Sequence, residues 1–125
     1  MTKAKILIVD DEADFLNTCS RLLARLGFEC ITAQDGPRAF ELIERERPDL
    51  VLTDLSLPVG DGFQVVRCAR AGVPSIPVII VTAYHTPQIA KKAREEGVAA
   101  YLPKPFSNRE LSDAVFYALT EPSAE

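Results

Sequence analysis

Short apolar runs recur along the chain, and four of them end at polar residues that can bind ions or take part in chemistry. A short apolar run bounded by turn-forming residues is typical of a strand buried in a sheet. A further apolar stretch, residues 28–33, follows Gly27 and is expected to form the second strand. The four runs and the residues that follow them are 6–9 with Asp10 and Asp11, 50–53 with Asp54, 78–81 with Thr82, and 100–103 with Lys104.

The segments between these runs carry apolar residues at the spacing of amphipathic helices. Pro48 closes the second helix, Thr86 has the form of an N-cap for the fourth, and Ser107 with Glu110 matches a capping box for the last. The phase of the third apolar face stays open, because its continuation would include Arg70. The expected apolar faces are Phe15, Cys19, Leu22 and Leu26, with Leu16 and Leu23 beside them; Ala39, Phe40 and Ile43; Phe63, Val66 and Ala69, with Val65 and Cys68 beside them; and Leu111, Ala114, Val115 and Ala118.

The alternation of strands and helices, with short connections, predicts an α/β fold. Five such units form a doubly wound parallel sheet of five strands with helices on both faces and right-handed crossovers. We expect one domain over residues 1–120, followed by a polar tail at residues 121–125. The sequence shows no internal repeat and no second domain.

The composition adds little to this picture but excludes several classes of protein. The chain has 125 residues, 47% of them apolar, and a net charge of −4, which argues against direct binding of nucleic acid. No apolar run approaches the roughly 20 residues that span a bilayer, so no membrane contact is expected. No secretory signal is expected either. Cys19, Cys30 and Cys68 form no metal-binding motif and are expected to be reduced thiols of a cytoplasmic protein.

The four polar exits predict a site for a metal ion and a phosphoryl group. In a parallel sheet they all lie at the carboxyl edge, where open α/β folds place their ligands. Asp10, Asp11 and Asp54 would repel one another unless a cation neutralised them, and three carboxylates suit Mg²⁺. Asp54 can then act as a nucleophile that forms an aspartyl phosphate, with Lys104 and Thr82 stabilising the phosphoryl oxygens.

Each of these residues also has a purely structural interpretation. An acidic pair after a strand suits the cap of the next helix, and Asp54 suits a turn. Thr82 is a common strand residue, and a lysine such as Lys104 is usually a solvated charge. The joint placement of all of them at strand ends favours the functional interpretation.

These motifs, in this order and spacing, resemble the receiver domain of the response regulators of two-component signalling. The resemblance covers about residues 5–119, and it implies the flavodoxin-like fold with strand order 2-1-3-4-5. The motifs that carry it are Ile-Leu-Ile-Val-Asp10-Asp11-Glu12, Val-Leu-Thr-Asp54-Leu-Ser-Leu-Pro58, Asp61-Gly62-Phe63, Val81-Thr82-Ala83 and Tyr101-Leu102-Pro103-Lys104-Pro105-Phe106.

The resemblance also implies a role for each site residue. Asp54 would accept a phosphoryl group from a histidine kinase or a histidine phosphotransfer protein. Asp10 and Asp11 would bind Mg²⁺, together with Asp54 and the backbone carbonyl of Ser56. Lys104 would bind the phosphoryl group. The Lys104–Pro105 peptide bond would be cis, which directs the lysine side chain into the site.

Signal output is implied as well, through a switch pair formed by Thr82 and Tyr101. The surface built by the fourth helix, the fifth strand and the fifth helix would then contact a downstream protein. Such a chain would be a signalling domain rather than an enzyme, apart from its own phosphorylation and dephosphorylation, and either a monomer or a weak phosphorylation-dependent dimer. The candidate contact residues are Ile89, Lys92, Glu96, Tyr101, Arg109 and Tyr117.

The sequence departs from the family pattern at a few positions near the site. Gly60 replaces a bulkier residue, and Tyr84, which with Ser56 would flank the phosphoryl group, is large.

A phosphatase of the haloacid-dehalogenase type is the main alternative, but it needs an acidic residue where Ser56 stands. A nucleotide- or flavin-binding module would need a glycine-rich loop where residues 10–14 are acidic, and a pure scaffold leaves the acidic site unexplained. A stand-alone regulator and a receiver excised from a larger protein both fit.

Overall fold

The computed structural model describes residues 3–120, and within them five strands alternate with five helices. The expected tail at residues 121–125 lies outside the described residues. The strands are β1 (Lys5–Val9), β2 (Glu29–Ala33), β3 (Leu50–Thr53), β4 (Val78–Thr82) and β5 (Ala100–Pro103). The helices are α1 (Ala13–Arg25), α2 (Gly36–Glu46), α3 (Gly62–Arg70), α4 (Pro87–Glu95) and α5 (Asn108–Thr120).

All five strands are parallel and form one sheet in the order β2-β1-β3-β4-β5. This arrangement confirms the flavodoxin-like topology expected from the sequence. The order reverses direction at β1, since β2 pairs on one side of it and β3 on the other. The carboxyl ends of β1 and β3 therefore lie next to each other, at the switch point where such folds bind ligands.

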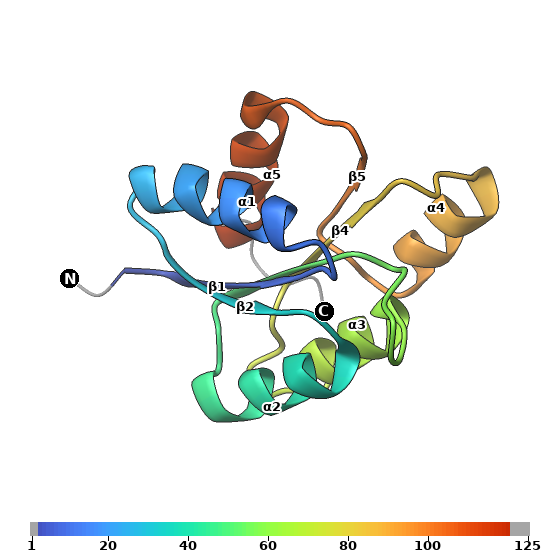
Figure 1. Cartoon of the computed structure of the whole chain (residues 1–125). Helices are drawn as coiled ribbons and strands as arrows, with labels where there is room; N and C mark the ends of the chain where they lie inside the picture. Colours follow the sequence, from blue (N-terminus) through green and yellow to red (C-terminus); the bar gives the residue numbers. More distant parts are fainter. Residues whose placement is uncertain (1–2, 121–125) are drawn as a thin grey trace.

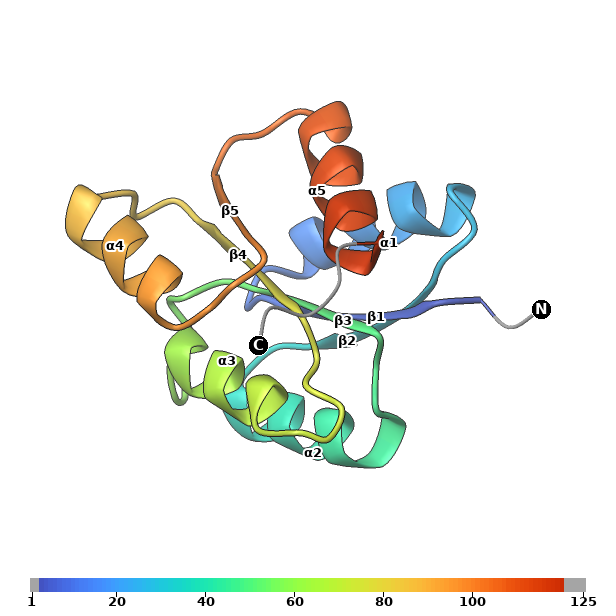
Figure 2. The same cartoon turned by 180° about the vertical axis from the view of Figure 1, so that it is seen from behind.

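Helices cover both faces of the sheet, as Figures 1 and 2 show. Side chains of β1 alternate between the two faces: Ile6 and Ile8 pack against α1 and α5, while Leu7 and Val9 pack against α2 and α3. The period of two in a strand produces this division. Because both faces are covered, the central strands are apolar along their whole length, which is why they read as continuous apolar runs.

Local capping fixes where several helices begin. Thr86 accepts a hydrogen bond from the amide of Ile89 at 3.1 Å, which confirms the expected N-cap of α4. The capping box of α5 is confirmed too: the Ser107 hydroxyl accepts from the amide of Glu110 at 3.0 Å, and the Glu110 carboxylate accepts from the amide of Ser107 at 2.8 Å. A cap of this kind typically contributes about 1 kcal/mol.

The apolar face of α1 differs in phase from the expectation, and the structure resolves the phase of α3, which the sequence left open. The buried line of α1 is Leu16, Cys19 and Leu23, whereas Leu26, expected on that face, is 39% exposed at the end of the helix. In α3 the open phase resolves onto Val65, Val66 and Ala69, with Phe63 half-buried beside them. Adjacent apolar positions on a helix differ by only 100°, so spacing alone does not select the central one.

Candidate functional site

Two buried carboxylates lie side by side at the carboxyl edge of the sheet. The amide of Asp10 donates to the carbonyl of Ala33 at 3.1 Å, and the amide of Asp54 donates to the carbonyl of Val9 at 3.0 Å. These hydrogen bonds continue the strand ladders by one residue beyond β1 and β3. They fix both aspartates where the strands end, with Asp10 fully buried and Asp54 7% exposed.

Lys104 joins the two carboxylates. Its ammonium nitrogen lies 2.7 Å from Oδ2 of Asp10 and 3.1 Å from Oδ2 of Asp54. The segment after β5 directs it there, because the Lys104 amide donates to the carbonyl of Thr82 at 2.8 Å. The Lys104–Pro105 peptide bond is cis, as the sequence resemblance predicted, and Val73–Pro74 is also cis.

Burial and hydrogen bonding shift the pKa values of Asp10 and Lys104. Burial raises the pKa of Asp10, even though the hydrogen bonds from Lys104 and from the amide of Glu12 oppose that shift. Burial would lower the pKa of Lys104, but its hydrogen bonds to Asp10 and Asp54 outweigh burial and raise it. The raised pKa favours the charged form of Lys104, and its positive charge offsets the repulsion between the two carboxylates.

The second oxygen of Asp54 is held by the loop that follows it. The amide of Ser56 donates to Oδ1 of Asp54 at 3.0 Å, and Ser56 forms an isolated antiparallel bridge with Asp61 that closes the loop. Gly62 begins α3 against this turn, and a Cβ added there would lie 2.6 Å from the Cα of Leu55. The Asp61-Gly62 pair therefore permits the tight return of the chain beside Asp54.

Thr82 stands at the end of β4, fully buried. Its hydroxyl oxygen accepts a hydrogen bond from the amide of Tyr84 at 3.0 Å, so the hydroxyl proton stays available for another acceptor. Tyr84 itself is 66% exposed. Tyr101 lies on the neighbouring strand β5, paired in register with Ile80, and is half-buried against the core.

Asp11 differs from its neighbours, because its side chain is exposed. Within residues 3–120, no three His, Cys, Asp or Glu side chains gather closely enough to enclose a metal ion. Lys104 instead occupies the space between Asp10 and Asp54. The donor chemistry nevertheless fits Mg²⁺, which needs only one or two carboxylates and keeps several waters.

Two aromatic residues, Phe15 and Phe106, complete the surroundings of the site, and the sequence patterns assigned them no such role. The Lys104 ammonium lies 4.1 Å from the centroid of the Phe15 ring, a cation–π contact. Phe106 packs edge-on against Phe15, with centroids 6.0 Å apart. Phe106 belongs to the Lys-Pro-Phe motif, so the sequence did contain a signal that it lies near the site. Phe15 appears in the sequence only as part of the apolar face of a helix.

Two of the six candidate contact residues on the α4-β5-α5 surface are engaged with side chains of α3. The Glu96 carboxylate pairs with the guanidinium of Arg67 on α3, at 2.8 and 3.3 Å, and the Lys92 ammonium lies 4.5 Å from the centroid of the Phe63 ring. Both contacts hold α4 against α3. Tyr117, by contrast, is 52% exposed and free to meet a partner.

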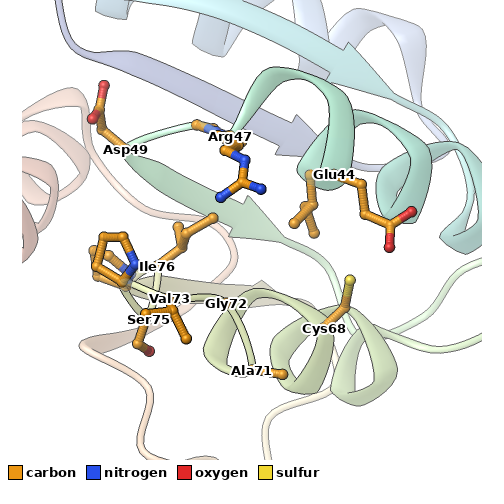
Figure 3. A pocket seen from close by; sticks show the side chains of 13 residues that line it. Glu44, Arg47, Asp49, Cys68, Ala71, Gly72, Val73, Ser75 and Ile76 are labelled. Atoms are coloured by element: carbon orange, nitrogen blue, oxygen red, sulfur yellow. The ribbon is translucent and has the colours of Figure 1, made fainter.

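A cavity of about 760 Å³ lies at the opposite end of the molecule. It is bounded by the end of α2 and by the segment between α3 and β4, and Figure 3 shows the side chains of Arg47, Glu44 and Cys68 around it. None of the carboxyl-edge residues lines it. This cavity is therefore separate from the acidic cluster at the carboxyl edge.

The fold and the arrangement of Asp10, Asp54 and Lys104 resemble those expected for a receiver domain, and similarity to known proteins identifies the family. Residues 6–116 match the response regulator receiver domain. The chain belongs to this family. Within the described residues, no helix combines the length and apolar character needed to cross a membrane.

Relatives of known name agree with this assignment. Sporulation initiation phosphotransferase F of Bacillus subtilis is 34% identical over 115 residues, which are 92% of this chain and 93% of that protein. The transcriptional regulatory protein PrrA of Mycobacterium tuberculosis is 37% identical over 89% of this chain, but only 48% of PrrA is covered. The chain thus spans about half the length of such regulators.

Solved structures show the same fold. A response regulator receiver domain protein from Clostridium thermocellum is 32% identical, with a TM-score of 0.86 over 93% of this chain and 94% of that one. The chemotaxis protein CheY4 of Vibrio cholerae is 28% identical, with a TM-score of 0.87 over 94% of this chain and all of that one. These similarities lend no support to the haloacid-dehalogenase alternative.

Proposed function

We propose that Asp54 is the phosphoacceptor of this receiver domain. The single observation that carries the proposal is the placement of Lys104, whose ammonium binds both Asp54 and Asp10. When a phosphoryl group forms on Asp54, an ammonium in this position can move to bind the phosphoryl oxygens. The amide of Ser56 keeps the Asp54 carboxylate in one orientation for in-line attack.

A phosphohistidine is the donor that this chemistry suits. The Asp54 carboxylate forms the bond to phosphorus while the bond from phosphorus to the donor's imidazole nitrogen breaks, and the imidazole takes up a proton. A histidine kinase or a histidine phosphotransfer protein supplies such a group. The domain would then act as a signalling element over residues 1–120, with no catalytic activity toward another substrate.

Mg²⁺ is proposed as the cofactor, held by Asp10, Asp11, Asp54 and the backbone carbonyl of Ser56. When bound, it supplies positive charge that neutralises the carboxylates and the phosphoryl oxygens. Asp10 and Asp54 are both buried, and both carboxylates would lie beside the ion. Asp11, exposed beside them, is free to turn toward the ion.

The output of the domain is proposed to run through Thr82 and Tyr101. The Thr82 hydroxyl keeps its proton available, and a phosphoryl oxygen on Asp54 offers it an acceptor. Movement of Thr82 toward the phosphoryl group would make room for the Tyr101 ring and shift the segment before α4, which biases an equilibrium between two states. A downstream protein would recognise the resulting α4-β5-α5 surface, and the domain would be a monomer or a weak phosphorylation-dependent dimer.

A cytoplasmic location completes the proposal. Cys19, Cys30 and Cys68 are all free thiols, as expected for a protein of a reducing compartment.

Incubation with acetyl phosphate and Mg²⁺ tests the proposal. Intact-mass spectrometry should show one added phosphoryl group on the native chain, and none on the Asp54→Ala variant or in the presence of EDTA. Asp49→Ala, at an exposed carboxylate on the far side of β3, is the matched control and should be labelled normally. Stable labelling of Asp54→Ala would assign the phosphoryl group to another residue and overturn the proposal.

A further inference from the structure

The side chain of His85 ties the segment between β4 and α4 to the neighbouring strand β5. Its Nδ1 atom lies 3.0 Å from the hydroxyl oxygen of Tyr101. The two rings also pack against each other, with centroids 5.4 Å apart and an angle of 41° between their planes. His85 therefore restrains Tyr101 both by a hydrogen bond and by contact between the rings.

Little else fixes this segment of the chain. Residues 83–86 are all exposed, and α4 buries only Ala93. Among the side-chain hydrogen bonds of residues 3–120, the one between His85 and Tyr101 is the one that joins this loop to β5. A segment with so little buried surface is held by individual contacts, so the loss of one contact is expected to change its conformational equilibrium.

The position of His85 along the chain connects it to the other switch residue. The amide of Tyr84, one residue earlier, donates to the hydroxyl oxygen of Thr82. Adjacent residues of the same loop thus contact Thr82 and Tyr101. A displacement of the loop that follows Thr82 must move His85 as well, and with it the partner of the Tyr101 hydroxyl.

We propose that His85 is a positioning residue that restrains the Tyr101 ring in its present orientation and thereby sets the balance between the two states of the domain. This inference rests on the proposed role of Asp54, Thr82 and Tyr101. The bond to His85 exists in the present orientation of the ring and is lost when the ring moves inward. Its removal raises the free energy of the present state alone, so the equilibrium shifts toward the phosphorylated form.

A double-mutant cycle tests this role. His85→Ala and Tyr101→Phe each remove the same hydrogen bond, and beryllofluoride with Mg²⁺ is the probe that imitates a phosphoryl group. Each single variant should bind the probe about two- to tenfold more tightly, the factor that corresponds to one ordinary hydrogen bond. The double variant should bind no more tightly than the better single one, because only one bond is lost. Gln88→Ala, at an exposed position in the first turn of α4, is the control and should leave the affinity unchanged.

A second readout is independent of the probe. In the free protein, the chemical shifts of the Tyr101 ring should change in His85→Ala toward values averaged between two ring orientations. In Gln88→Ala they should stay at their native values. Unchanged affinity and unchanged Tyr101 resonances in His85→Ala would overturn the inference, as would fully additive effects in the double variant. Failure of the native chain itself to bind beryllofluoride would instead overturn the proposed function, so the two failures are distinguishable.

Discussion

The ammonium group of Lys104 lies 2.7 Å from a carboxylate oxygen of Asp10, a residue with no exposed surface. Asp54 shares the same cation. One lysine therefore compensates two buried or nearly buried negative charges. We therefore expect both the stability of the fold and the chemistry of the site to depend on this arrangement.

Lys104→Met should destabilise the protein in the absence of metal. The substitution keeps most of the side chain's volume but leaves the Asp10 and Asp54 carboxylates without a cation, which should lower the free energy of unfolding by about 2 to 4 kcal/mol. Urea denaturation in EDTA measures the change. Lys91→Met, at an exposed position of α4, is the control and should have little effect. An unchanged midpoint for Lys104→Met would show that the carboxylates need no compensation.

Gly62→Ala should damage the site through the backbone. The added Cβ would lie 2.6 Å from the Cα of Leu55 and would also meet the backbone of Asp54, so the turn that orients Asp54 must open. We expect a loss of about 1 to 3 kcal/mol in the free energy of unfolding, as for other overpacked positions, and slower labelling by acetyl phosphate. Gly72→Ala, whose Cβ would lie 3.2 Å from the Pro74 carbonyl oxygen, is the milder comparison. Equal behaviour of the two variants would contradict this account.

Arg67→Met should loosen α4 without unfolding the domain. The pair between Arg67 and Glu96 joins α3 to α4, and α4 buries little surface of its own. Hydrogen exchange measured by mass spectrometry should show faster exchange of the α4 amides, while the melting temperature changes little because the pair is exposed. Arg38→Met removes a comparable pair with Glu41 within α2 and should leave α4 unaffected. Unaltered exchange in α4 would mean that the ion pair does not hold this helix.

The thiols of Cys19 and Cys30 should react slowly in the native protein. Burial raises the pKa of each thiol to about 11, so the reactive thiolate is scarce at pH 8. Iodoacetamide should modify the less buried Cys68 first and reach the other two only in denaturant, as followed by peptide mass spectrometry. Rapid alkylation of native Cys19 at pH 8 would contradict the prediction.

The same shifts predict how stability depends on pH. The pKa values of Cys19 and Cys30 are raised in the folded state above the ordinary value of 9.0, so the fold favours the neutral thiols. Their contribution is fully present below pH 9 and is lost as the pH rises toward 11. Cys19→Ala should flatten this loss in urea denaturation curves.

The sheet and the strand-end residues could be predicted from sequence because they depend on local patterns. Residues 6–9 read as a buried run in any context, and the residue after a parallel strand must lie at the carboxyl edge. The capping box at Ser107 is equally local. Such features do not depend on how distant segments pack.

Other features depend on contacts across the fold and could not be predicted in this way. Leu26 lies exposed just after the end of α1, and the cation–π contact between Phe15 and Lys104 joins residues far apart in the chain. The same holds for the His85–Tyr101 bond and the pairing of Glu96 with Arg67. Nothing in the spacing of these residues along the chain indicates that they meet.

The most direct test of the central claim is an amide NMR titration with beryllofluoride and Mg²⁺. We expect shifts around Asp54 and also across α4, β5 and α5, and we expect Thr82→Val to retain the first group and lose most of the second. That result would show that occupancy at Asp54 reaches the distant surface through Thr82. Shifts confined to the neighbourhood of Asp54 in the native chain, with α4 and β5 unmoved, would contradict the account.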